Sequence, residues 1–148
     1  MQIVEGTIKD CLEVTSHIPE FGDNQYDEAV FRNRLLGTEN LILLAVRNNR
    51  NVGFKVGYRR DEDGSFYSWM GGVIPEFRKL GIAKKLADTQ EEWAKKRSYT
   101  SITFKTRNYL KPMLIFALKN GFNIINVIPK EKITNHRIIL RKELNESE

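Results

Sequence analysis

Three strand-like runs separated only by tight turns constrain the fold of this chain more than any other feature. NLILLAVRN at 40–48 is almost continuously apolar, which is typical of a strand buried on both faces. NVGFKVGYRR at 51–60 and SFYSWMGGVI at 65–74 follow after short turns. The Asp63-Gly64 pair before the third run is a strong hairpin signal. These runs predict an antiparallel meander at the centre of the fold.

Patterns on either side of the meander complete the predicted order of elements. Helical spacing of apolar residues predicts helices at 8–17, 26–36, 81–97 and 109–119, and short runs predict strands at 2–5, 100–106, 122–128 and 136–144. Ile102 and Phe104 are expected to point inward from their strand. Pro112 fits only the first turn of its helix, and Gly121 suits the position after the last turn. The order β-α-α-β-β-β-α-β-α-β-β predicts an α+β fold, with a mixed, mostly antiparallel central sheet flanked by about four helices.

Length, charge and residue counts exclude several classes of protein. Residues 1–148 show no linker or composition break, so we predict a single domain. The N-terminus does not resemble a signal peptide and no run is long enough to cross a membrane, which predicts a cytoplasmic protein. Cys11 has no second cysteine to pair with, and only His17 and His136 accompany it, so we expect no metal site. The net charge of +5 is compatible with nucleic acid or with a polyphosphate ligand.

The sequence VIPEFRKLGIAKKLAD, residues 73–88, begins like a buried strand and ends like an amphipathic helix. A helix N-terminus has unpaired N–H groups and the positive end of the helix dipole, so it attracts anions. Gly81 and Ala83 would let a ligand approach the backbone, while Arg78 and Lys84 would add positive charge. From these residues alone, the junction is either a phosphate site or a solvated basic turn.

The same junction resembles a known family. RKLGIA at 78–83 resembles the R/Q-x-x-G-x-G/A motif of the GNAT superfamily of N-acetyltransferases. VIPEF at 73–77 is similar to the strand end that precedes that motif, and KNGF at 119–122 is similar to the Gly-Phe close of the family's fourth helix. The order of elements fits from about residue 3 to 144, so the resemblance implies a GNAT-like fold over nearly the whole chain.

The resemblance implies an acetyl-CoA site. Backbone N–H groups at the junction would hold the CoA pyrophosphate, and the N–H of Val73 would polarise the thioester carbonyl. Gly71 and Gly72 suit a bulge that separates this strand from the next, although they are equally consistent with packing around Trp69. Asn108 either contacts the pantetheine arm or caps the following helix. The cosubstrate-binding residues implied are Val73, Ile74, Arg78, Lys79, Leu80, Gly81, Ile82, Ala83, Lys84 and Asn108.

The chain departs from the family pattern where a proton donor is expected. Many members carry a tyrosine four residues before the glycine of Gly-Phe, and Ala117 stands there in this chain. Tyr109 begins the same helix but lies roughly 12 Å away along it, so it is a poor substitute. The base that accepts the amine proton is not fixed either. The candidates are Glu76, Glu20, Asp23 and Tyr67, each of which is otherwise an ordinary exposed carboxylate or a core-edge tyrosine.

The loop at 17–28 should form one wall of the acceptor site, as the resemblance implies. Phe21 and Tyr26 either line a pocket or anchor the loop to the core. Carboxylates in this stretch would attract a cationic amine, although such a cluster is usually just solvated; they are Glu20, Asp23, Asp27 and Glu28.

The sequence therefore predicts an enzyme that transfers an acetyl group from acetyl-CoA to a small-molecule or peptide amine by direct attack in a ternary complex. Two alternatives are a CoA-binding protein without catalysis and a basic nucleic-acid-binding module, for which we find no motif. The resemblance implies no metal. Dimers are common in the family, so a homodimer is compatible with the resemblance but is not decided by the sequence.

Overall fold

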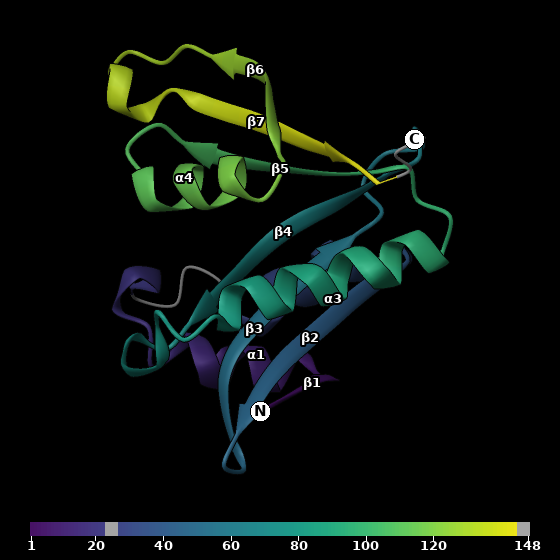
Figure 1. Ribbon diagram of the computed structural model, residues 1–148, viewed down its shortest axis with the longest axis vertical. Helices are drawn as coiled ribbons and strands as arrows, with labels where there is room; N and C mark the ends of the chain where they lie inside the picture. Colours follow the sequence, from purple (N-terminus) through teal and green to yellow (C-terminus); the bar gives the residue numbers. More distant parts are fainter. Residues whose placement is uncertain (23–26, 145–148) are drawn as a thin grey trace.

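The computed structural model describes residues 1–22 and 27–144, and within them it contains seven strands and four α-helices (Figure 1). In chain order these are β1 (Gln2–Glu5), α1 (Ile8–Thr15), α2 (Glu28–Leu35), β2 (Asn40–Arg47), β3 (Arg50–Tyr58), β4 (Ser65–Val73), α3 (Ile82–Lys96), β5 (Ser101–Arg107), α4 (Lys111–Lys119), β6 (Asn123–Ile128) and β7 (Arg137–Glu143). The predicted order of elements is confirmed. No helix in these residues is long and apolar enough to span a membrane.

The strands form one mixed sheet in the order β1-β2-β3-β4-β5-β7-β6. Every neighbouring pair is antiparallel except β4 and β5. These two strands pair only from Ser65 to Tyr67, opposite Ser101 to Thr103. Beyond this point they diverge, which Figure 1 shows as a widening gap between β4 and β5. From Ser68 onward, β4 therefore has an edge without a partner strand.

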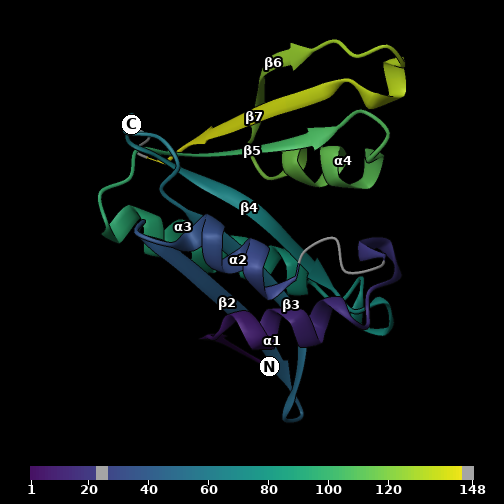
Figure 2. The same ribbon diagram turned by 180° about the vertical axis from the view of Figure 1, so that it is seen from behind.

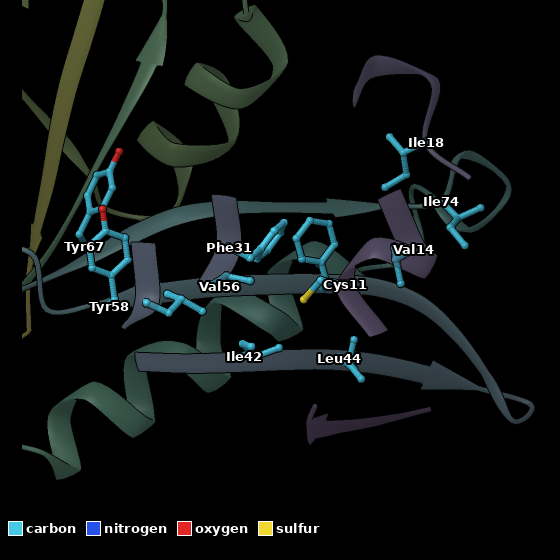
Figure 3. Close-up of a cluster of buried hydrophobic side chains, with 12 residues drawn as sticks. Cys11, Val14, Ile18, Phe31, Ile42, Leu44, Val56, Tyr58, Tyr67 and Ile74 are labelled. Carbon is cyan, nitrogen blue, oxygen red and sulfur yellow. The ribbon is translucent and has the colours of Figure 1, made fainter. Parts of the chain in front are cut away.

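Both faces of the β1–β4 part of the sheet are covered by helices. Ile42 and Leu44 of β2 pack in a cluster with α1 and α2, whereas Leu41 and Leu43 pack in a second cluster with α3. Figure 2 shows α1 and α2 in front of the sheet and α3 behind it. The first cluster, shown in Figure 3, encloses Cys11, and this burial raises the pKa of its thiol to about 12. Cys11 is thus a packing residue rather than a nucleophile.

Helix α4 covers the same face as α3, but on the other side of the gap. Ile102 of β5 packs in the cluster with α3, and Phe104 packs in a third cluster with α4. Residues two apart on a strand point the same way, so the two helices share a face. Ala117 of α4 is buried in this third cluster with Ile138 and Leu140 of β7.

The ends of α4 correct one expectation and confirm another. The helix begins at Lys111 after the N-cap residue Leu110, so Asn108 is not its cap. Pro112 sits in the first turn, where its missing N–H costs no hydrogen bond. At the other end, Gly121 has φ 93°, and the N–H of Phe122 donates to the Ala117 carbonyl at 3.0 Å. This is the glycine-terminated helix end that the sequence predicted.

The bulge in β4 lies earlier than the glycine pair suggested. The pairing of β4 with β3 shifts by one residue at Trp69, so Trp69 and Met70 both pack toward α1 and α2. Gly71 and Gly72 are explained by close packing instead. A Cβ on Gly72 would lie 2.9 Å from Ile18, and one on Gly71 would lie 2.9 Å from the carbonyl oxygen of Phe54. The backbone contact excludes a larger residue at Gly71, whereas at Gly72 the Ile18 side chain would have to shift.

Candidate active site

The free edge of β4 presents backbone groups to the gap. The N–H of Ile74 donates to the Val52 carbonyl of β3 at 2.9 Å. Backbone groups of a strand alternate between its two edges, so the N–H groups of Val73 and Gly71 point away from β3, toward the gap. Ile74 has little to offer a ligand, because its side chain is buried and its carbonyl accepts from Phe77. Gly71 is a second edge donor that sequence reasoning missed.

The loop from β4 to α3 has a backbone shape suited to an anion. Lys79 and Gly81 both adopt left-handed conformations, with φ 65° and 82°. Gly81 is the N-cap residue of α3, and no side chain caps the helix there. The first-turn N–H groups of Ile82, Ala83 and Lys84 therefore have no intrahelical partner. A Cβ on Gly81 would meet nothing within 4 Å, so the space in front of the helix end is open.

Helices α1 and α2, on the opposite face of the sheet from α3, have side-chain caps at their N-termini. The Thr7 hydroxyl accepts from the N–H of Asp10 at the start of α1, and Asp10 reciprocates in a capping box. Asp27 likewise accepts from the N–H of Val30 at the start of α2. The start of α3 thus lacks the carboxylate or hydroxyl that satisfies these two, and its first turn contains no acidic residue.

The cations expected to serve this loop are engaged elsewhere. Lys84 pairs with Asp88 at 2.8 Å, and this hydrogen bond raises the pKa of Lys84. Arg78 donates from Nε to the Val73 carbonyl at 3.0 Å and from both Nη atoms to Glu20 at 3.0 and 3.1 Å. Arg78 therefore connects the end of β4 to the loop after α1. Lys79 and Leu80 are exposed at the loop surface.

The candidate bases differ in exposure and in the direction of their pKa shifts. The Arg78 hydrogen bonds lower the pKa of Glu20, which makes it a weaker base. Tyr67 is buried, and burial raises the pKa of its hydroxyl. Glu76 is exposed in the short turn Pro75–Phe77 that follows β4. Asp23 and Tyr26 lie outside the described residues.

The structure also places the candidates in α4 and in the segment before it. The amide of Asn108 donates to the Ile133 carbonyl at 3.1 Å, and its oxygen accepts from Lys111 at 3.0 Å. It thereby ties the start of α4 to the loop before β7. Ala117 is 2% exposed, and Tyr109, at 55% exposed, points to solvent. The proton donor that the family pattern leads one to expect is thus absent from α4 within the described helix.

Lys55 is a titratable group that sequence reasoning missed. It pairs across the strands with Gly71, and its Cγ would lie 3.5 Å from a Cβ there. Its neighbours Gly53 and Gly57 face α3, so Lys55 also lies on the α3 face. Burial lowers its pKa to about 8, and the charge of Glu91 opposes this shift. The signal in the sequence was a lysine between glycines in an otherwise apolar strand.

Comparison with known proteins identifies the family of the chain. The model of the acetyltransferase (GNAT) family matches residues 8–122, so the chain belongs to the GNAT family of acetyltransferases. No curated protein matches the chain.

Solved structures share the fold over the whole chain. Ard1 from Thermoplasma volcanium has a TM-score of 0.80 at 19% identity, covering 98% of each chain. An aminoglycoside 6'-N-acetyltransferase complexed with coenzyme A has a TM-score of 0.79 at 16% identity, covering 100% of this chain and 99% of the other. The ribosomal-protein-S18-alanine N-acetyltransferase from Escherichia coli has a TM-score of 0.77 at 16% identity, covering 99% and 96%. At these identities the likeness concerns the fold.

Proposed function

We propose that the protein transfers an acetyl group from acetyl-CoA to a primary amine, by direct attack of the amine on the thioester. One observation carries the proposal: the free edge of β4 is followed, after the loop at 74–81, by an uncapped helix N-terminus. A ligand with an extended amide-containing arm joined to a pyrophosphate matches this combination of edge and anion site. Coenzyme A has that form, and one of the structural neighbours was solved with it.

The fit rests mainly on backbone groups. The N–H groups of the first turn of α3, together with the left-handed residues Lys79 and Gly81, would hold the pyrophosphate. Lys79 is exposed and adds positive charge near them. Arg78 acts indirectly in this proposal, because its guanidinium is held by Glu20 and the Val73 carbonyl.

Val73 and Gly71 perform the polarisation step. Their N–H groups point to the gap, so either can donate to the thioester oxygen and stabilise the negative charge that develops there. The amine nitrogen forms a bond to the carbonyl carbon, the carbon–sulfur bond breaks, and CoA leaves as a thiolate. The nitrogen, now positively charged, releases its extra proton to solvent and becomes the amide nitrogen of the product. An alkyl ammonium has a pKa near ~10.4, so the nitrogen must first lose a proton. Glu76 stays our proposed base, because its exposed carboxylate can pass that proton to solvent.

Lys55 is the proton donor that we propose for the thiolate. It lies beside Gly71 on the α3 face, and its lowered pKa allows the ammonium to give up a proton near neutral pH. The neutral amine of Lys55 then regains a proton from solvent. This role replaces the tyrosine that the family pattern would place at position 117.

A CoA-binding protein without catalysis is the second candidate, and Ala117 is the observation that favours it. Two measurements separate the candidates. Acetyl-CoA should raise the melting temperature under either, by binding only the folded state. Release of free thiol in the presence of a broad amine panel should occur only if the protein is an enzyme. Absence of a thermal shift at millimolar acetyl-CoA would refute both.

A further inference from the structure

We propose that the acceptor amine also carries an anionic group, a carboxylate or a phosphate, which is bound by a basic cluster of Arg34, Arg60, Lys105 and Arg137. This inference rests on the proposed function, since it names the class of amine that the same site would accept. The four residues come from α2, the turn after β3, β5 and β7. They lie near Tyr67, the last residue of β4 that pairs with β5.

Strand alternation places two members of the basic cluster on the far side of the gap. Ile102 and Phe104 point toward α3 and α4, so Lys105 points to the opposite face, the one that α1 and α2 cover. Ile138 packs under α4, so Arg137 points the same way as Lys105. Lys105 lies two residues beyond Thr103, the last residue of β5 that pairs with β4.

Aromatic contacts place the other two members on the near side. The guanidinium of Arg34 lies 4.7 Å from the centre of the Trp69 ring, and its Nη1 donates to the Tyr58 hydroxyl at 3.4 Å. Arg60 lies 5.0 Å from the centre of the Tyr67 ring. Figure 3 shows the hydroxyl groups of Tyr58 and Tyr67 pointing in the same direction, away from β1 at the bottom of the view. Aromatic platforms of this kind orient a guanidinium without neutralising it.

The described carboxylates do not pair with the basic cluster. Within residues 1–22 and 27–144, none of its four members forms an ion pair with a carboxylate. Lys105 has a lowered pKa because it is partly desolvated and lies near the other three; Asp61 opposes this shift. Cations that destabilise one another become stabilised when an anion enters among them.

The carboxylates expected to attract a cationic amine are already occupied where they are described. Glu20 binds Arg78, Asp27 caps α2, and Glu28 pairs with Arg32. The expectation of a cationic acceptor is therefore not supported by these three side chains. A polycation would meet the basic cluster instead and be repelled by it.

The position of the basic cluster fits an acceptor rather than the cosubstrate. In the proposed function the cosubstrate's phosphates lie at α3, on one face of the sheet, so the amine approaches through the gap from the opposite face. When the nitrogen of such an acceptor lies in the gap, the remaining part of the acceptor molecule lies beside the basic cluster. The Trp69 ring that holds Arg34 lies two residues from Gly71 along β4, about 7 Å at the rise of a strand. An acceptor in which only a few bonds separate the amine from the anion, as in an amino acid or a phosphorylated amino alcohol, fits this spacing.

Matched amines test the inference directly. Ethanolamine, O-phosphoethanolamine, β-alanine and putrescine would be compared as acceptors by thiol release from acetyl-CoA. We expect kcat/KM for one of the two anionic amines to exceed that for ethanolamine by about ten- to a hundredfold, and putrescine to be the poorest. Which anionic amine is preferred distinguishes phosphate from carboxylate. The preference should shrink as salt is raised.

Variants assign the preference to residues. Lys105→Met and Arg34→Gln should each raise KM for the anionic acceptor by about tenfold while leaving KM for acetyl-CoA unchanged. Arg32→Gln is the matched control, because it removes an exposed arginine of the same helix that pairs with Glu28. Equal acetylation of ethanolamine and the anionic amines, or a preference untouched by both variants, would overturn the inference.

A binding measurement keeps this result separate from failure of the proposed function. If no amine releases thiol, calorimetry of O-phosphoethanolamine, β-alanine and ethanolamine with the CoA-bound protein still decides the inference. Tighter binding of an anionic amine that Lys105→Met abolishes would support it, although the catalytic proposal would fail. Equal or absent binding of all three would refute it.

Discussion

Gly81→Asp tests whether the start of α3 binds the phosphates of CoA. Gly81 has φ 82° and is the N-cap residue of the helix, with open space where its Cβ would be. Gly37 provides a matched control, because it has φ 74° and its Cβ would also meet nothing within 4 Å. Gly37 follows α2, on the opposite face of the sheet from α3.

The backbone cost should be the same in the two variants. An L-residue held in the left-handed region loses roughly 1–2 kcal/mol relative to glycine. In a chain of this size that corresponds to a melting temperature lower by about 2–8 °C. Because both glycines have similar φ values and open surroundings, the two variants should lose similar folding stability, and a difference in CoA affinity reports the change at the start of α3.

The electrostatic cost should appear only at Gly81. A carboxylate roughly 5 Å from a phosphate is repelled by about 1–3 kcal/mol, for an effective dielectric constant between that of water and that of a protein surface. The new carboxylate would also accept from first-turn N–H groups that the phosphate needs. The dissociation constant for CoA should therefore rise by about five- to a hundredfold in Gly81→Asp.

Isothermal titration of CoA into the wild type and both variants measures this directly. Gly37→Asp should bind CoA as the wild type does, despite its lower melting temperature. If the two variants bind CoA with equal affinity, the phosphates do not lie at the start of α3 and the reasoning from its uncapped N–H groups is wrong.

Three further predictions concern single side chains. The pKa of Glu20 is lowered in the folded state, so its pair with Arg78 stabilises the fold above the ordinary carboxyl pKa near 4.5 and is lost as the pH falls. Glu20→Gln should lower the urea midpoint at pH 7 but not at pH 3; a loss at both would exclude an ionic origin. The pKa of Lys55 is lowered from 10.5 to about 8, so the unfolded chain binds its proton more tightly, and wild-type stability should rise between those pH values. Lys55→Met should remove this rise and stabilise the protein at pH 7 by about 2–3 kcal/mol. The same variant should lower kcat by about tenfold or more, and an unchanged kcat would exclude a role as proton donor. Ala117→Tyr should cost about 1–3 kcal/mol, because the site is 2% exposed and already filled, and a thermal melt that matches the wild type would show that α4 can move.

The order of elements was predictable because it depends on local patterns. The apolar run at 40–48 is buried at five consecutive positions, Leu41 to Ala45, as its composition indicated. The Asp63-Gly64 turn and the helix end at Gly121 are likewise encoded by a few adjacent residues. The expected start of α4 was two residues early, because the helical pattern alone does not show that Leu110 is the N-cap.

The backbone part of the candidate site was predictable for the same reason, and the side-chain part was not. The glycine motif and the helix that follows it are local, so the loop at 78–83 was recognisable in the sequence. The partner of Arg78 is Glu20, which lies 58 residues away, and no local pattern links them. The basic cluster draws on four separate elements, so its members become neighbours only once the sheet has formed.

These two kinds of site have different consequences for the chemistry of the protein. Backbone N–H groups at the start of α3 and on the edge of β4 exist for almost any side chain, so cosubstrate binding should tolerate most substitutions that keep the local conformation. The basic cluster consists of side chains, and each can be changed without altering the sheet. Arg78 belongs to the first of these two sites, because it connects the Val73 carbonyl at the edge of β4 to Glu20 in the loop after α1. If the two sites act as we propose, the specificity for the acceptor can change through a few cations while the acetyl-CoA site stays intact.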